Sequence, residues 1–364
     1  MCMKKQDWNR QLMAEQYKLA CEKAASSYAH ECDEYILQAI DEEDVDVFPM
    51  EDRFKDRVND DAKWLEKYHY FNHDIETFAD ISSILPSTVQ MDELKVPLGI
   101  VFGEIHDFFN HLGGEWRNLF NKVYRERDNN LRFSNERSYN FYLPGQDYSY
   151  INIQKTDTIE VFTDLAHEYG HSIADMMKYR MYAEDKDLYP FIELPPIFFQ
   201  FAIGDWLSES RESLDNLVND ELVVMARTCG NYANYITYLN KYLTTLNDKG
   251  RKVPTKYADF VRGMVRALNI TKPEVKTSFD KSKKEQYIYV IPYLTALELY
   301  YIYKEDPKEA LKLLKEIIMV EQKKYYNEYL RSLGITLNEH SEEHVKTIMK
   351  RYNQFNNNQQ KKQS

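Results

Sequence analysis

Apolar residues recur every three to four positions along most of this 364-residue chain, which is the period of an amphipathic helix. Gly113 and Gly114 interrupt one such segment, and we expect them to divide it into two helices. The pattern therefore predicts a mainly α-helical fold. The predicted helices are at 5–40, 53–84, 97–127, 191–213, 219–247, 254–269, 286–304, 306–334 and 340–354.

The period changes to two between Leu131 and Gln154, where aromatic and polar residues alternate on either side of Pro144 and Gly145. Proline followed by glycine indicates a turn, so this segment predicts a small antiparallel hairpin. An extended peptide could add to the edge of the hairpin as a further strand, because main-chain hydrogen bonds do not depend on particular side chains. A hairpin that only packs on the helices explains the pattern equally well.

Shortly after the hairpin comes the pentapeptide HEYGH, His167 to His171, within VFTDLAHEYGHSIADMM. Apolar residues around it recur at helical spacing, which places it on a half-buried helix. Two histidines four residues apart share one face of a helix, so both imidazoles can bind one metal ion with Glu168 beside them. This is the arrangement of zinc hydrolases. In the alternative interpretation, the two histidines only cap a polar face.

A zinc site of this kind takes a third protein ligand from a later segment. Glu193 is the preferred candidate, because it lies 22 residues after His171 in the apolar segment FIELPPIFFQFAIGDW, where an unpaired carboxylate is expensive to bury. Alternatively, Glu193 lies at a helix start ahead of Pro195 and Pro196 and interacts with the helix dipole. Gly170 within the predicted helix indicates that another element approaches closely, such as the one carrying Glu193. The other acidic candidates are Asp175, Glu184, Asp185, Asp187, Asp205 and Glu209.

The stretch YINIQKTDTIEVFTDLAHEYGHSIADMM, followed by ELPPIFFQ, resembles the oligoendopeptidase F and thimet oligopeptidase family of zinc metallopeptidases, the M3 group. The similarity covers about Tyr148 to Gln200. The resemblance implies a multi-helix zincin-type fold with a small antiparallel hairpin or sheet beside the active-site helix. It also implies one zinc ion per chain, bound by His167, His171 and Glu193, with Glu168 as the general base.

A second region, from Gln286 to Ile317, is similar to a family segment whose tyrosines hydrogen-bond the tetrahedral intermediate. By position, the resemblance implies a catalytic role for Tyr293 first and for Tyr289 next. Judged by the helical period alone, packing on a helix face explains both tyrosines at least as well.

The chain departs from the family pattern at three points. No histidine occurs between His171 and His340, although the family carries one shortly before its tyrosines. Gln200 stands seven residues after the third ligand, where the family often has glutamate. The chain is also much shorter than usual members. A further motif, HSEEH from His340 to His344, matches the inverted zinc pattern, but it lies in a polar segment and no acidic residue or histidine follows it. We therefore expect no second metal site there.

Composition excludes other classes of function. The apolar content of 43% allows a sizeable core, and we expect one continuous two-lobed unit with a helical region at 1–130, a catalytic region at 131–354 and a disordered polar tail at 355–364. The formal net charge of −12 argues against nucleic acid as a partner. No apolar run is long enough to cross a membrane, and the N-terminus lacks the apolar core of a secretory signal. With 4 scattered cysteines, the sequence predicts a soluble cytoplasmic protein.

These observations predict a zinc-dependent endopeptidase that hydrolyses short peptides, with Glu168 accepting a proton from metal-activated water. A catalytically weakened relative that binds peptides or metal is the alternative. In a third interpretation the chain is a purely structural helical protein and HEYGH is accidental.

Overall fold

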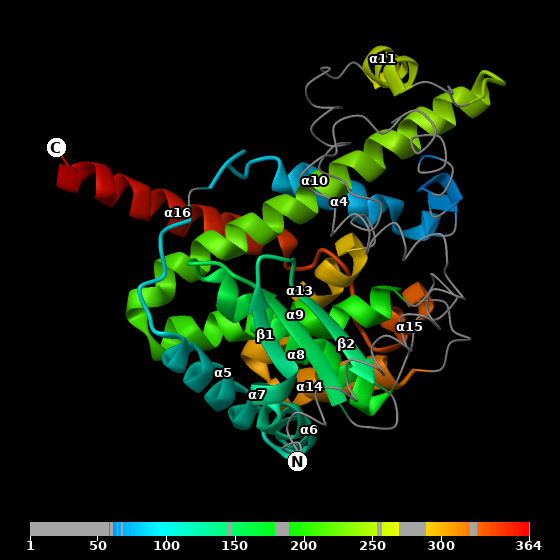
Figure 1. Ribbon diagram of the computed structural model, residues 1–364. Coiled ribbons are helices and arrows are strands. Elements are labelled where there is room, and N and C mark those ends of the chain that lie inside the picture. The colour runs from blue at the N-terminus through cyan, green and yellow to red at the C-terminus, as the bar shows by residue number, and fades with distance from the viewer. Residues whose placement is uncertain are drawn as a thin grey trace, which may run out of the picture. The chain divides into compact units, whose positions relative to one another are not determined.

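The computed structural model describes residues 58, 61–63, 65–66, 68–89, 91–143, 148–178, 189–252, 257–268, 289–320 and 326–363 (Figure 1). The chain divides after Met50 into two compact units, and all of these residues belong to the second, Glu51–Ser364. The helix predicted at 5–40 lies outside the described residues. The described residues of the second unit are mainly α-helical with one small sheet, which confirms the predicted fold class.

The sheet has three strands, β1 (Leu131–Ser134), β2 (Tyr139–Leu143) and β3 (Tyr148–Gln154), in the order β1-β3-β2. The predicted hairpin is confirmed for β2 and β3, which pair antiparallel. β1, however, pairs parallel with β3, so the sheet is mixed. Residues 135–138 cross the end of β3 because the buried side chain of Asn152 holds this connection. Its Nδ2 donates to the carbonyl oxygen of Arg137 at 2.7 Å, and its Oδ1 accepts from Ser134 Oγ at 2.8 Å.

Helix α8 (Glu160–Met177) carries HEYGH and begins shortly after β3. It packs against the sheet on one side and against α5 (Leu98–Leu112) and α6 (Gly114–Arg125) on another. Phe109 of α5 stacks on Phe120 of α6 at 4.4 Å, and both rings contact Tyr169 of α8. The predicted break between α5 and α6 is confirmed, because Gly113 and Gly114 adopt φ values of 69° and 51°.

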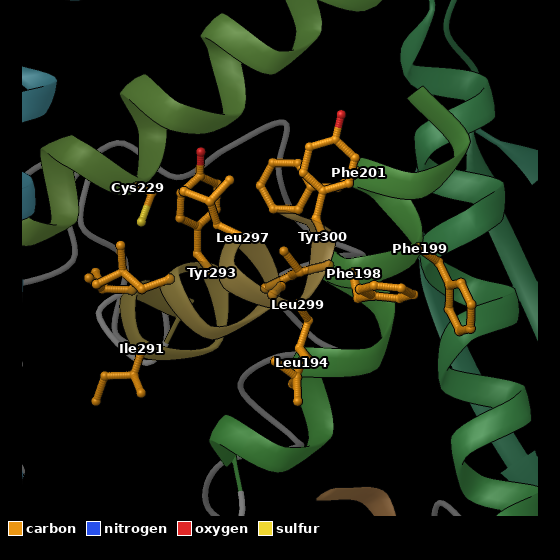
Figure 2. Close-up of a cluster of buried hydrophobic side chains, with 14 of the residues drawn as sticks. Leu194, Phe198, Phe199, Phe201, Cys229, Ile291, Tyr293, Leu297, Leu299 and Tyr300 are labelled. Atoms are coloured by element: carbon orange, nitrogen blue, oxygen red, sulfur yellow. The ribbon is translucent and has the colours of Figure 1, made fainter. Parts of the chain in front are cut away.

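Helix α9 (Tyr189–Ser210) lies between α8 and α13 (Val290–Glu305) and carries Pro195 and Pro196 in its interior. Large apolar side chains fill the α9–α13 interface, and the long helix α10 (Asp215–Asp248) adds Cys229 to it (Figure 2). Both α9 and α13 are therefore buried on more than one side.

The remaining elements surround these helices. They are η1 (His69–Phe71), α4 (Asn72–Ser82), α7 (Arg127–Asn130), η3 (Glu212–Leu214), α11 (Tyr257–Leu268), α14 (Pro307–Met319), α15 (Tyr326–Ser332) and α16 (Ser341–Gln363). Both α4 and α16 pack on α10. None of the helices in the described part of the chain is long and apolar enough to cross a membrane.

Two boundaries differ from the sequence-based expectation. The helix predicted at 306–334 ends at Met319, where Val320 adopts an extended conformation with φ −58° and ψ 140°. The tail predicted to be disordered from residue 355 continues α16 as far as Gln363. Buried Val345 and Ile348 anchor that helix.

Candidate metal centre

Three side chains from two helices meet at one point. His167 and His171 of α8 direct their Nε2 atoms to Glu193 of α9, and each Nε2 lies 3.6 Å from Glu193 Oε2. Each of these three residues offers one ligand atom, an imidazole nitrogen or a carboxylate oxygen. The three atoms all lie within 4.8 Å of one another, and in the described part of the chain they form a possible metal-binding group. The predicted ligand set is thus brought together by the fold.

The spacing of these atoms fits a zinc ion. Zinc bonds of about 2.0–2.2 Å to nitrogen and oxygen in a tetrahedron separate the ligand atoms by roughly 3.3–3.6 Å. Glu193 is 8% exposed, and its Oε2 atom is buried without a hydrogen-bond partner. A cation at this position would compensate the buried carboxylate, and the residues present therefore fit the metal.

The pKa values show how the group balances its charge with protons alone. Burial opposes protonation of His167, but the nearby carboxylates of Glu193 and Glu168 raise its pKa to about 9. Burial lowers the pKa of His171 to about 4. Burial acts to raise the pKa of Glu193, yet the two histidines and a hydrogen bond from Tyr289 lower it below its ordinary value. The carboxylate is therefore charged and offset by a proton on His167, a place that a metal ion would take.

Gly170 allows α8 and α9 to come close enough to form this group. A Cβ atom on Gly170 would lie 2.8 Å from Pro196 Cα and 3.0 Å from Phe199 Cδ2. The prediction that the element carrying Glu193 approaches the helix at Gly170 is confirmed.

Gln200 holds His167 from the side opposite the metal group. Its Oε1 lies 3.0 Å from His167 Nδ1, so it accepts the Nδ1–H of the ring and leaves Nε2 facing Glu193, where a metal ion could replace its proton. The sequence identified Gln200 only as a departure from the family. Its spacing of two helical turns from Glu193 is the signal that places both side chains on one face of α9.

Glu168 lies beside the ligands and is 4% exposed. Burial, with the charges of Asp164 and Glu193, raises its pKa to about 8 although His167 acts in the opposite direction. Its Oε2 atom is buried and accepts no hydrogen bond. A carboxyl group with a free oxygen and a pKa near neutrality is suited to accept and return a proton.

Asn140 connects the edge strand β2 to the motif helix. Its Nδ2 donates to Ser172 Oγ at 2.6 Å and to the carbonyl oxygen of Glu168 at 3.1 Å. These bonds fix β2 alongside the metal group. Sequence reasoning missed Asn140, since an asparagine in an alternating strand does not reveal which helix it contacts.

Of the two predicted tyrosines, the structure brings only Tyr289 to the metal group, where its hydroxyl hydrogen-bonds Glu193. Tyr293 lies one turn further and points toward Cys229 of α10 (Figure 2). Its ring contacts Phe78 at 5.5 Å and Phe201 at 5.3 Å. Burial raises the pKa of Tyr293 well above its usual value, and its hydroxyl has no hydrogen-bond partner. The structure therefore places Tyr289, and not Tyr293, beside Glu193. The helical period could not show which of the two tyrosines faces α10.

No protein-family model matches the sequence, and no curated protein matches it. Among solved structures, the putative peptidase from Chlamydophila abortus is similar with a TM-score of 0.53 and 12% sequence identity, over 82% of this chain and 55% of that one. The chain has the fold of that protein.

Two structures of putative oligoendopeptidase F give lower TM-scores. One has a TM-score of 0.49 and 10% identity over 85% of this chain and 58% of its own. The other, from Bacillus anthracis str. Ames, has a TM-score of 0.47 and 14% identity over 72% of this chain and 47% of its own. The chain spans about half the length of the solved structures that it matches.

A shallow hollow with room for about one water molecule lies on the His171 side of the metal group. Its walls combine apolar side chains with one acidic and one basic residue. They are formed by His171, Ala174, Asp175, Lys178, Phe191, Ile192 and Ile318. The hollow offers a small group a place next to one of the ligands.

The second histidine motif does not form a metal group with other described residues. His340 Nδ1 lies 2.6 Å from Glu298 Oε2, and the ring stacks on Tyr301. His344 is buried against Phe201 and Tyr301, and burial lowers its pKa to about 3. Both histidines therefore have structural partners.

Proposed function

We propose that this chain is a zinc-dependent peptidase that hydrolyses peptide bonds of short peptides, with one zinc ion per chain. The observation that carries the proposal is the position of Glu193 Oε2. It is a buried carboxylate oxygen without a hydrogen-bond partner, 3.6 Å from the Nε2 atoms of both His167 and His171. Glu168, the predicted base, adjoins this group.

The metal, when bound, lowers the pKa of water and polarises a carbonyl group. Glu168 accepts a proton from the attacking water on its free Oε2 and returns it to the departing amine. Gln200 keeps His167 in the tautomer whose Nε2 is available as a ligand. Among the described residues, the hydroxyl of Tyr289 is a phenolic donor that hydrogen-bonds Glu193, and we assign to it stabilisation of the negative charge that develops on the substrate oxygen.

We place the bound peptide along β2. This strand is at the edge of the sheet, so its outer side pairs with no other strand among the described residues. Asn140 fixes the same strand to the turn of α8 that carries Glu168. A peptide added there by main-chain hydrogen bonds would pass the metal group with little requirement for particular side chains. We place the enzyme in the cytoplasm, where the thiol of Cys229, which is free and buried, stays reduced.

A catalytically weakened peptide- or metal-binding protein is the second candidate function. The observation in its favour is that Tyr293 is buried away from the metal group, which leaves one phenol where the resemblance implied two. Each oxyanion donor lost typically lowers kcat about 10²–10³-fold.

Metal analysis combined with cleavage of a quenched fluorescent peptide library separates these functions. The wild type and Glu168→Gln are compared, because the substitution removes the base without removing a ligand. We expect about one zinc per chain in both proteins and a loss of at least about 100-fold in cleavage rate for the variant. Stoichiometric zinc without cleavage by either protein would favour the weakened binder. Absence of stoichiometric metal would contradict both proposals.

A further inference from the structure

The side-chain amide of Asn140 uses both of its N–H donors on the turn of α8 that begins at Glu168. One is donated to Ser172 Oγ, with 2.6 Å between the nitrogen and the oxygen, and the other to the carbonyl oxygen of Glu168 at 3.1 Å. Ser172 is fully buried, and its hydroxyl donates in turn to the same carbonyl oxygen at 3.1 Å. Asn140 therefore keeps no N–H for a substrate, and any part that it plays in the reaction is indirect.

The side chain of Glu168 depends on its own backbone for its position. It is 4% exposed, and its Oε2 atom has no hydrogen-bond partner that could hold it. In an α-helix the carbonyl oxygen of Glu168 accepts the N–H of Ser172, and here two further donors join that bond. Additional donors of this kind fix a peptide plane and bend the helix locally. Because the carbonyl and side chain share one Cα atom, holding the carbonyl also fixes the direction of the carboxyl group.

A second bond shows that the chain around β2 follows α8 for more than one turn. Ser138, just before β2, donates from Oγ to Asp164, one turn ahead of Glu168. Ser138 and Asn140 are two residues apart on extended chain, which is roughly 6.8 Å. Asp164 and Glu168 are four residues apart on a helix, which is about 6 Å along the axis. The two spacings match, so the strand cannot shift along the helix without losing both bonds.

The pairing of β2 with β3 directs Asn140 toward the interior. It lies opposite Ile151, which is fully buried, and Tyr142 on the same face of β2 is 9% exposed. The outer side of β2, where we place the bound peptide, is therefore only one side chain away from the backbone of Glu168.

We propose that Asn140 is a positioning residue of the peptidase reaction. It holds the carbonyl group of Glu168, and so keeps the carboxyl group at a fixed distance from a peptide bound along β2. This inference rests on the proposed function and adds a residue to it that contacts neither the metal group nor the substrate with its side chain.

The kinetics of Asn140→Ala test the proposal with a library peptide that the wild type cleaves. We expect kcat to fall about 10–100-fold, since small displacements of a catalytic group have effects of this size. KM and the dissociation constant of zinc should stay within about twofold of the wild type. In the Glu168→Gln background the base is already absent, so Asn140→Ala should lower the residual rate by less than about twofold. A role in general stability would give the same loss in both backgrounds.

Ser138→Ala is the matched control, because it removes a bond of the same kind one turn earlier. It should leave kcat within about twofold of the wild type. Hydrogen exchange of the metal-free proteins gives a readout that does not depend on activity. Asn140→Ala should accelerate exchange of the amides around Ser172, whereas Ser138→Ala should leave them protected. Ser172→Ala, a smaller change, should lower kcat in the same direction if Asn140→Ala does not fold.

The outcomes separate this inference from the proposed function. A wild type that cleaves peptides beside an equally active Asn140→Ala would overturn the positioning role and leave the peptidase intact. An equal loss of kcat in Ser138→Ala, or an undiminished effect of Asn140→Ala in the Glu168→Gln background, would assign the effect to the docking of β2 and also overturn it. A wild type that carries zinc but cleaves no peptide would overturn both proposals.

Discussion

At the scale of single residues, His167 is held from both sides of its ring by one helix. Glu193 faces Nε2, and Gln200, two turns further along α9, accepts the Nδ1–H. A carboxylate at position 200 would add negative charge to the imidazole and make it a stronger ligand, whereas the amide only orients it. The chain therefore fixes the tautomer of His167 without adding a second charge to the metal group.

Substitution of Gln200 tests this role. Gln200→Leu removes the acceptor for Nδ1–H, so both tautomers become accessible and we expect zinc affinity to fall about 10–100-fold. Gln200→Glu should bind zinc more tightly than the wild type. Competition with a chromophoric chelator measures the dissociation constants. An unchanged zinc affinity in Gln200→Leu would show that packing alone orients the ring.

The two tyrosines give a matched pair of variants. Tyr289→Phe removes the hydroxyl at the metal group, and we expect kcat to fall about 10²–10³-fold with a smaller change in KM. Tyr293→Phe removes a buried hydroxyl that has no partner, so kcat should be unchanged and stability equal or slightly higher. Steady-state kinetics and thermal unfolding measure both. Equal losses of kcat in the two variants would show that the hydroxyl of Tyr293 also contributes to catalysis.

At the scale of elements, the group depends on how closely α8 and α9 pack. Gly170→Ala places a Cβ atom 2.8 Å from Pro196 Cα, so the backbones must separate. We expect destabilisation of about 1–3 kcal/mol, although alanine favours a helix, together with weaker zinc binding. Gly103→Ala on α5 is the control, since its Cβ meets nothing within 4 Å, and it should stabilise by about 1 kcal/mol. Denaturant unfolding compares the two, and a Gly170→Ala protein as stable as Gly103→Ala would contradict the close approach.

Titration at the α8–α10 interface gives a prediction about pH. The folded protein raises the pKa of Glu221 from the ordinary 4.5 to about 8, so this group is neutral in the fold at pH 6 but charged in the unfolded chain. Its contribution to stability is fully present below pH 4.5 and is lost as the pH rises through 8. Glu221→Gln should therefore unfold at a higher temperature than the wild type at pH 9, with the difference shrinking toward pH 5. A difference that is constant with pH would assign the effect to packing.

The sequence predicts elements that form through interactions between neighbouring residues. It does not predict those that depend on contacts between residues far apart in the chain. HEYGH and the break at Gly113 and Gly114 depend on local spacing and backbone freedom, and both are where they were expected. The parallel pairing of β1 depends on the side chain of Asn152 holding a distant loop, which an alternating pattern does not show. The direction of Tyr293 depends in the same way on packing against other helices.

At the scale of the whole second unit, residues that are far apart in the sequence converge on one group. His171 and Glu193 are 22 positions apart, and Tyr289 follows almost a hundred residues later at the start of α13. Without a metal, the contact between α8 and α9 at this point leaves a buried carboxylate oxygen unpartnered. A bound ion would be coordinated by that oxygen and by both histidines, and would therefore connect the two helices. Metal binding and folding of this unit should be coupled for this reason.

Removal of the metal should therefore lower the stability of the fold. A ligand that binds only the folded state at 1,000 times its dissociation constant adds about 4 kcal/mol, which corresponds to a rise in melting temperature of roughly 5–10 °C for a unit of this size. Zinc should give this rise in the wild type and in Glu168→Gln, which keeps all three ligands. It should give little or none in Glu193→Ala, where the third ligand is missing. Scanning calorimetry with chelator and then with buffered zinc measures the shift, and an equal rise in Glu193→Ala would move the third ligand to another residue.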